Sequence, residues 1–179
     1  MNLRLLVTLI CVAFSTNTFS QIYKMQADSL VKNIENYIYK SIETEGVIVH
    51  ICGVDGKKMK LKTENGEIIK IVPKDSLNSF DESFYKKRVK IQGIVSEFRI
   101  DKNYIDKMEN EKKLLCHIDN SPCKDSEWVN NKKQSGKADV ISKQDIERLR
   151  TKMEQTGKAY VSIITIFADK VEIIDEIKK

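Results

Sequence analysis

Apart from Cys11, which lies in the N-terminal apolar stretch, the histidines and cysteines of this chain fall into two small groups. The chain has 179 residues and two histidines, and each histidine lies close to a cysteine. His50 and Cys52 are two positions apart in an apolar stretch, so on a β-strand their side chains would project from the same face. Cys116 and His117 are adjacent, and Cys123 follows in the same polar segment. Imidazole and thiolate are the ligands that Zn²⁺ and soft copper ions prefer, so the two groups would form a metal site if folding brought them together.

The same cysteines support other interpretations. Cys116 and Cys123 would close a loop of eight residues. Such a pair in an exported protein commonly forms a disulfide, which stabilises by roughly 2–3 kcal/mol in the chain-entropy model. Unpaired thiols, either redox-active or packed as small apolar groups, are the remaining alternative. The spacing is not that of a zinc knuckle or a zinc ribbon.

Catalytic motifs are not evident. Cys52 with His50 or His117 could act as a nucleophilic pair, but no third residue that would orient the histidine can be recognised, and neither an oxyanion loop nor a phosphate-binding glycine loop is present. The sequence therefore predicts a protein that is not an enzyme and that carries no cofactor, with zinc or copper as the alternative.

A row of lysines and a single tryptophan are the candidate contacts for a larger ligand. Lys58, Lys60 and Lys62 alternate with apolar residues, so they would share one face of a strand. Trp128 is the only tryptophan and lies in a polar segment. The alternatives are a solvated lysine face and a tryptophan that pins its loop to the rest of the fold.

The first twenty residues resemble an export signal. Arg4 precedes an apolar stretch over residues 5–14, and small and polar residues follow up to Ser20. We expect cleavage near Ser20 and a periplasmic or extracellular protein. No later stretch is long enough to span a bilayer.

The charge balance argues against one class of partner. The net charge is +5, from 31 basic and 26 acidic residues whose signs are interspersed. Binding to nucleic acid requires a concentrated basic face, which this chain does not show. We therefore expect a peptide, glycan or protein of the cell envelope as partner, and no nucleic acid.

The remaining pattern predicts a small β-barrel. Five strand-like segments follow an amphipathic helix expected over residues 28–42, within an N-terminal region 21–44, and the last strand is separated from the others by an insertion. The strands are expected at residues 46–52, 58–63, 67–72, 88–100 and 160–174. Asn65 and Gly66 predict a tight hairpin turn, and a change of apolar phase at Gly93 predicts a bulge or bend. This order matches the OB-fold, so the fold class is a β-rich α+β protein whose OB-like domain spans residues 45–179.

The insertion, residues 101–158, is expected to be helical at both ends. Asp101 can cap a helix that runs to about Leu115, and Ser142 can cap a second helix that ends before Gly157. The polar stretch between them is expected to be irregular.

Several segments also resemble a largely uncharacterised family of small exported bacterial OB-fold proteins. The resemblance is carried by Val49-His50-Ile51-Cys52, Gly56-Lys57-Lys58-Met59-Lys60-Leu61, Gly93-Ile94-Val95 with Glu97 and Arg99-Ile100-Asp101, and Thr156-Gly157-Lys158 before Tyr160-Val161-Ser162. Members of that family often carry a histidine soon after the first-strand cysteine, whereas Gly53 and Val54 follow Cys52 here. The resemblance implies the fold and export but no activity. Together these observations predict a non-catalytic OB-fold binding module of the cell envelope, with a metal-binding or thiol redox protein as the alternative.

Overall fold

The structure is a computed structural model that describes residues 21–52, 56–74 and 77–174. The predicted export signal, residues 1–20, lies outside the described residues.

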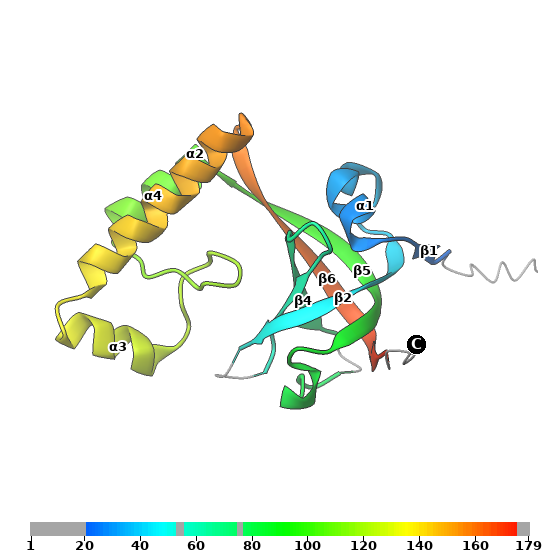
Figure 1. Cartoon of the computed structure of the whole chain (residues 1–179). Helices are drawn as coiled ribbons and strands as arrows, with labels where there is room; N and C mark the ends of the chain where they lie inside the picture. Colours follow the sequence, from blue (N-terminus) through cyan, green and yellow to red (C-terminus); the bar gives the residue numbers. More distant parts are fainter. Residues whose placement is uncertain (1–20, 53–55, 75–76, 175–179) are drawn as a thin grey trace, which may run out of the picture.

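The fold is a closed, five-stranded, mixed β-barrel of OB-like α+β type, as the sequence predicted (Figure 1). Its strands are β2 (Ser41–Ile51), β3 (Met59–Lys62), β4 (Ile68–Pro73), β5 (Arg88–Asp101) and β6 (Tyr160–Ile173). Strands β2, β3 and β4 form an antiparallel meander, β4 pairs in parallel with β6, and β6 pairs antiparallel with β5. The pairing of β5 with β2 closes the barrel. The C-terminal strand thus returns after the insertion to complete the cylinder begun by β2.

Alternation along the strands fills the barrel with branched aliphatic side chains. On β3, Met59 and Leu61 are fully buried, while Lys60 and Lys62 face outward. The fully buried members of this core from the strands are Ile42, Ile48, Met59, Leu61, Ile69, Ile71, Val89, Ile91, Val95, Ile166 and Ala168.

Gly93 marks the bend in β5 that the sequence predicted. The register between β5 and β6 shifts between Gln92 and Gly93. A Cβ atom at position 93 would lie 2.8 Å from the carbonyl carbon of Phe167 and 2.9 Å from the Cα of Ala168, and closer still to the Phe167 carbonyl oxygen. Only glycine lets the two backbones approach this closely, and the bend lets both long strands leave the barrel and reach the insertion.

The N-terminal helix is shorter than the sequence predicted. Strand β1 (Tyr23–Lys24) pairs in parallel with β2, and α1 (Ala27–Lys32) is followed by a single 3₁₀ turn, η1 (Ile34–Asn36). The prediction of helix as far as residue 42 was wrong, because residues 41–44 belong to β2, where they pair with β5. The apolar residues continue at helical spacing from the N-terminal helix into β2 because Ile42 is buried in the same core as Leu30 and Ile34.

The insertion contains three helices rather than two. Helix α2 (Lys102–Asn110) begins after the Asp101 cap, as predicted, and ends five residues before Leu115. Helix α4 (Ala138–Thr156) begins four residues before Ser142, which is buried within the helix and is not its cap. The stretch expected to be irregular contains α3 (Ser126–Gln134). Its cap is Asp125, whose side chain accepts a hydrogen bond of 2.8 Å from the Trp128 amide.

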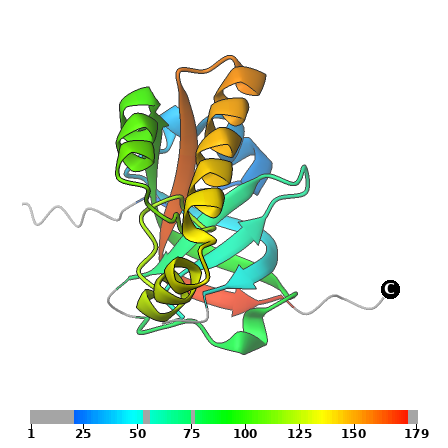
Figure 2. The ribbon, with the colours of Figure 1, turned by 90° about the vertical axis from the view of Figure 1, so that its left-hand side faces the viewer.

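A second, smaller core joins the insertion to the barrel. Figure 2 shows α2 and α4 side by side across the part of the β5–β6 ribbon that extends out of the barrel. The buried residues of this second core are Ile100, Ile105, Met108, Leu115, Ile146, Leu149 and Val161. This core fixes the position of residues 111–125, which lie between the helices and the barrel (Figure 1).

A short 3₁₀ turn, η2 (Glu82–Phe84), precedes β5.

Candidate functional site

Residues 114–123 form a tight hairpin that presents two cysteines and one histidine to the barrel. Leu115 forms an isolated antiparallel bridge with Pro122. The amide of Cys116 donates to the carbonyl of Ser121 at 2.7 Å, and the amide of Asn120 donates to the carbonyl of Cys116 at 2.8 Å. These bonds close the turn that carries His117.

Helices α2 and α4 hold this hairpin from behind. Asn120 is buried and has a positive φ of 55°. The Tyr104 hydroxyl donates to the Asn120 carbonyl at 2.9 Å, and the Arg148 guanidinium donates to its side-chain oxygen at 2.8 Å. One side-chain contact from each helix therefore fixes the tip of the hairpin.

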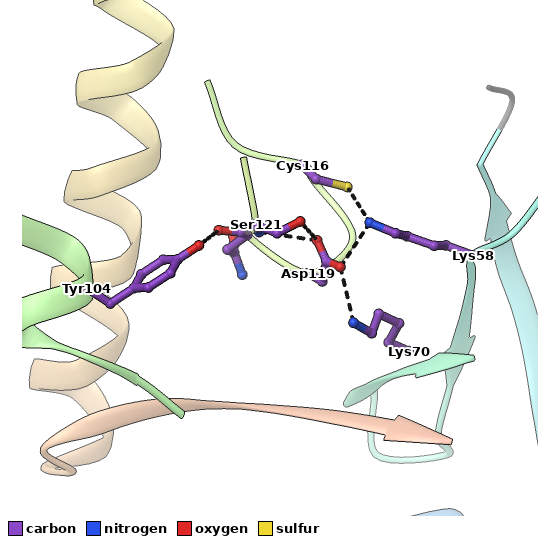
Figure 3. Close-up of polar contacts among 7 residues, drawn as sticks. Lys58, Lys70, Tyr104, Cys116, Asp119 and Ser121 are labelled. Carbon is purple, nitrogen blue, oxygen red and sulfur yellow. Dashed lines mark hydrogen bonds and ion pairs between the residues drawn. The ribbon is translucent and has the colours of Figure 1, made fainter. Parts of the chain in front are cut away.

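Asp119 attaches the hairpin to the outer face of the barrel (Figure 3). Its carboxylate lies 3.0 Å from the ammonium of Lys58 and 3.1 Å from that of Lys70, and it also accepts a hydrogen bond of 2.7 Å from the Ser121 hydroxyl. The Asp119 side chain is only 7% exposed. Burial opposes its ionisation, but the bonds from Ser121 and Lys58 and the charge of Lys70 together hold the pKa of this carboxyl well below its usual range. Asp119 is therefore a charged anchor between the two parts of the fold.

This attachment brings the two histidines into contact. The Nε2 atoms of His50 and His117 are 2.8 Å apart, and the rings meet edge to face with their centroids 4.5 Å apart. The pKa of each imidazole is lowered, mainly by burial, with the positive charge of Lys60 adding to the effect. Two neutral rings can share one hydrogen bond, in which one Nε2–H donates to the other Nε2.

A cavity of about 680 Å³ opens beside this pair, between the barrel and the insertion. All five histidine and cysteine residues singled out in the sequence line it. The full lining is His50, Cys52, Lys58, Leu115, Cys116, His117, Cys123, Lys124, Asp125, Glu127, Trp128, Ile141 and Asp145. The two groups of potential ligands, which are far apart in the sequence, thus line one cavity.

The geometry stops short of a formed metal site. Within the described ranges, no three His, Cys, Asp or Glu side chains stand close enough together to hold an ion without moving. What the arrangement provides is a paired imidazole and three thiols around one cavity.

The expected disulfide is not formed: Cys52, Cys116 and Cys123 are free thiols in the structure. The hairpin register gives the reason. Because Leu115 pairs with Pro122, Cys116 lies opposite Ser121 and diagonal to Cys123. Diagonal partners in a ladder have Cα atoms about 7–8 Å apart, beyond the usual disulfide range of about 4.4–6.8 Å.

We therefore expect Cys52, Cys116 and Cys123 all to be recovered as thiols. The protein would be denatured without reductant, alkylated and digested, and each cysteine-containing peptide would be weighed. We expect the alkylated form of all three, with a Cys116–Cys123 linked peptide absent. Recovery of the linked peptide from freshly isolated protein would contradict the register argument.

The three lysines Lys58, Lys60 and Lys62 have different surroundings in the structure. Lys58 lines the cavity, with its charge paired to Asp119. Lys60 is half-buried beside His50, its register partner on β2, and burial together with the charge of Arg148 lowers its pKa. Lys62 is exposed near the Gly66 turn and does not line the cavity. Of the three lysines, only Lys58 therefore lines the cavity.

Trp128 lies in the first turn of α3, lines the cavity and is partly buried. The ammonium of Lys132 lies 5.6 Å from its ring centroid. Sequence reasoning identified this residue but missed Asp119, which is one of many acidic residues in a polar segment. Only its nearness to His117 in the sequence distinguished it.

A second cavity, of about 390 Å³, lies between the N-terminal segment and β2. The buried hydroxyl of Thr44, which lines it, is the only buried side-chain polar atom without a hydrogen-bond partner in the described part of the chain. The charged side chains around it are mostly paired with one another, as in Lys24 with Glu43 and Arg88 with Glu45. It offers no chemistry comparable to that of the first cavity.

No protein-family model matches the chain, and no curated protein sequence is significantly similar to it. In the part of the chain that the structure describes, no helix has both the length and the apolar character to cross a membrane.

Proposed function

We propose that this protein is a non-catalytic binding module of the cell envelope whose ligand occupies the cavity between the barrel and the insertion. The observation that carries the proposal is the convergence of His50, Cys52, Cys116, His117 and Cys123 on that cavity. His50 belongs to β2 and Cys52 follows its last residue, whereas the other three come from a hairpin more than sixty positions later in the chain.

The size and lining of the cavity support a small ligand. Binding sites for small molecules typically occupy about 300–1,000 Å³ and combine apolar walls with a few polar groups. The lining of this cavity, at about 680 Å³, includes the apolar residues Leu115, Trp128 and Ile141. It also includes the paired imidazoles and the Lys58 ammonium. A small molecule or a short peptide segment fits this description better than a glycan chain or a flat protein surface.

The state of the thiols supports binding rather than nucleophilic catalysis. Burial raises the pKa of the Cys116 thiol, although the nearby Lys58 acts in the opposite direction. A nucleophilic cysteine needs a lowered pKa and an oriented base. The two imidazoles bond to each other, and neither is hydrogen-bonded to a thiol in the contacts described.

The cellular location in this proposal comes from the sequence. Residues 1–20 have the charge and apolar pattern of an export signal and lie outside the described residues. We propose that the mature protein acts in the periplasm or outside the cell.

The proposal is tested by weighing the intact protein under native conditions after isolation from the compartment to which it is exported. We compare the wild type with Ile141→Trp, which fills the cavity, and with Val140→Trp. Val140 is the neighbouring residue, is 57% exposed and does not line the cavity. We expect a stoichiometric added mass in the wild type and in V140W that is absent from I141W. A wild-type protein without added mass, or the same added mass on I141W, would overturn the proposal.

A further inference from the structure

The contact between the two histidines places two potential nitrogen ligands close to the separation that a shared metal ion requires. The Nε2 atoms of His50 and His117 point at one another across 2.8 Å. In a tetrahedral site with metal–nitrogen bonds of about 2.0–2.1 Å, two such nitrogens lie roughly 3.3 Å apart. The rings would therefore need to separate by about 0.5 Å and to tilt so that both Nε2 atoms face one ion.

Thiols are available on both sides of this pair. Cys52 follows His50 at the end of β2, and Cys116 precedes His117 on the hairpin, and both line the same cavity. The ammonium of Lys58 lies 4.0 Å from the Cys116 sulfur and also interacts electrostatically with Cys52. Both thiols therefore lie near one cationic group, on the wall of the same cavity as the two imidazoles.

We propose that the cavity holds one ion of a thiophilic d¹⁰ metal, Zn²⁺ or Cu⁺, bound by the Nε2 atoms of His50 and His117 and by the thiolates of Cys52 and Cys116. This inference rests on the proposed function, since it names the ligand of that same cavity. Imidazole and thiolate together suit both ions, and hard ions such as Mg²⁺ and Ca²⁺ prefer oxygen ligands.

The binding step is an exchange of the ion for protons. Each thiol that becomes a ligand releases its proton to solvent. The imidazole that donates its Nε2–H in the free protein moves that proton to Nδ1, so that both Nε2 lone pairs face the ion and neither imidazole loses a proton. The side chains of Cys52 and Cys116 must move toward the imidazole pair, because the ligands do not yet meet at one point.

Any movement of the hairpin on binding must be small. His117 lies at a turn whose backbone is closed by its own hydrogen bonds, so the turn would move as a unit. Asp119 and Asn120 tie the turn to the barrel and to the helices, which limits the shift to the short distance required. Cys123 lines the same cavity and is a further thiol for the ion if the hairpin turns.

The test begins with full-length reduced protein from which metal has been removed by a chelator. Zn²⁺ and Cu⁺ are titrated separately in competition with a coloured chelator specific for each ion. We expect one ion per chain, and a loss of affinity of about 100-fold or more for His50→Ala, His117→Ala and Cys116→Ser. Val140→Trp, at a position that is 57% exposed and does not line the cavity, is the control and should stay within about threefold of the wild type.

Cobalt provides a readout that does not depend on affinity. Co²⁺ in place of Zn²⁺ should give the intense thiolate-to-cobalt absorption of a tetrahedral site, and Cys52→Ser and Cys116→Ser should each weaken it. Circular dichroism of each variant confirms that the barrel is folded. A wild type that binds neither Zn²⁺ nor Cu⁺ at one ion per chain, or histidine variants that bind as tightly as the wild type, would overturn the inference.

The two experiments separate this inference from the proposed function. An organic added mass that is lost in I141W, together with no binding of either ion, would leave the binding module standing and overturn the metal site. An empty wild-type cavity with no ion binding would overturn both. A metal mass that is lost in I141W would support both, and its value would distinguish zinc from copper.

Discussion

Replacing Gly93 with alanine is expected to destabilise the barrel by about 3–5 kcal/mol. The added Cβ would lie 2.8 Å from the carbonyl carbon of Phe167 and 2.9 Å from the Cα of Ala168. Both are backbone atoms of the adjacent strand, so the clash cannot be relieved by a side-chain rotation. The β5–β6 register would have to change at the bend. Urea unfolding followed by circular dichroism measures the loss.

Gly136→Ala is the matched control for this prediction. Gly136 has a φ of 69°, and a Cβ there would meet nothing within 4 Å. Its replacement should therefore cost only the left-handed conformation, about 1–2 kcal/mol. Equal losses for the two variants would show that the close approach at Gly93 does not matter and that the bend can be made by other residues.

Removal of the Asp119 charge is expected to have the second largest effect. Asp119→Asn keeps the shape of the side chain but leaves Lys58 and Lys70, which are 23% and 17% exposed, without their common counter-ion. Breaking a largely buried ion pair on one side typically costs about 3–5 kcal/mol, and the partial exposure of both lysines reduces our expectation to about 2–4 kcal/mol. Because Asp119 links the insertion to the barrel, amide hydrogen exchange should accelerate first in the hairpin around Cys116.

Asp139→Asn is the control for the anchor. Asp139 pairs with Lys112 at 3.3 Å, and both side chains are more than 60% exposed. Its loss should change the free energy of unfolding by no more than about 1 kcal/mol. The double variant Asp119→Asn/Lys70→Met should be more stable than Asp119→Asn alone, because it removes one of the two ammonium groups that Asp119→Asn leaves without a counter-ion. Strictly additive effects would contradict the proposed coupling.

The barrel could be predicted because its signals are local. On β3 the alternation of Met59 and Leu61 with lysines specifies which side faces the core. Gly66, with a φ of 89°, confirms the predicted hairpin, and Gly93 lies at the predicted bend. Gly157 ends α4 in the left-handed conformation with a φ of 62°, as its type and position indicated. Each feature depends on a few neighbouring residues whose conformational preferences are strong.

Errors arose where tertiary contacts overrode a local pattern. Ile42 follows the helical spacing of the preceding residues, yet strand pairing with Gly93 places it in β2. The sequence predicts an irregular loop around Trp128, because residues 126–134 include few apolar side chains, yet the structure forms α3 there. Helix α3 has no strong apolar stripe and is stabilised instead by the capping bond to Asp125 and by the lysines of its last turn.

The sequence alone determined which chemical groups this protein can offer, namely two imidazoles and the thiols near them in two short segments. It also determined the strands of the barrel, because apolar and polar residues alternate along them. Only the tertiary structure decided that His50 and His117 touch, that Asp119 fastens the hairpin, and that Cys116 and Cys123 stay apart. The physical reason is that composition and alternation act between neighbouring residues. The contact of β2 with a hairpin more than sixty residues later depends instead on how the β5–β6 ribbon, α2 and α4 pack together.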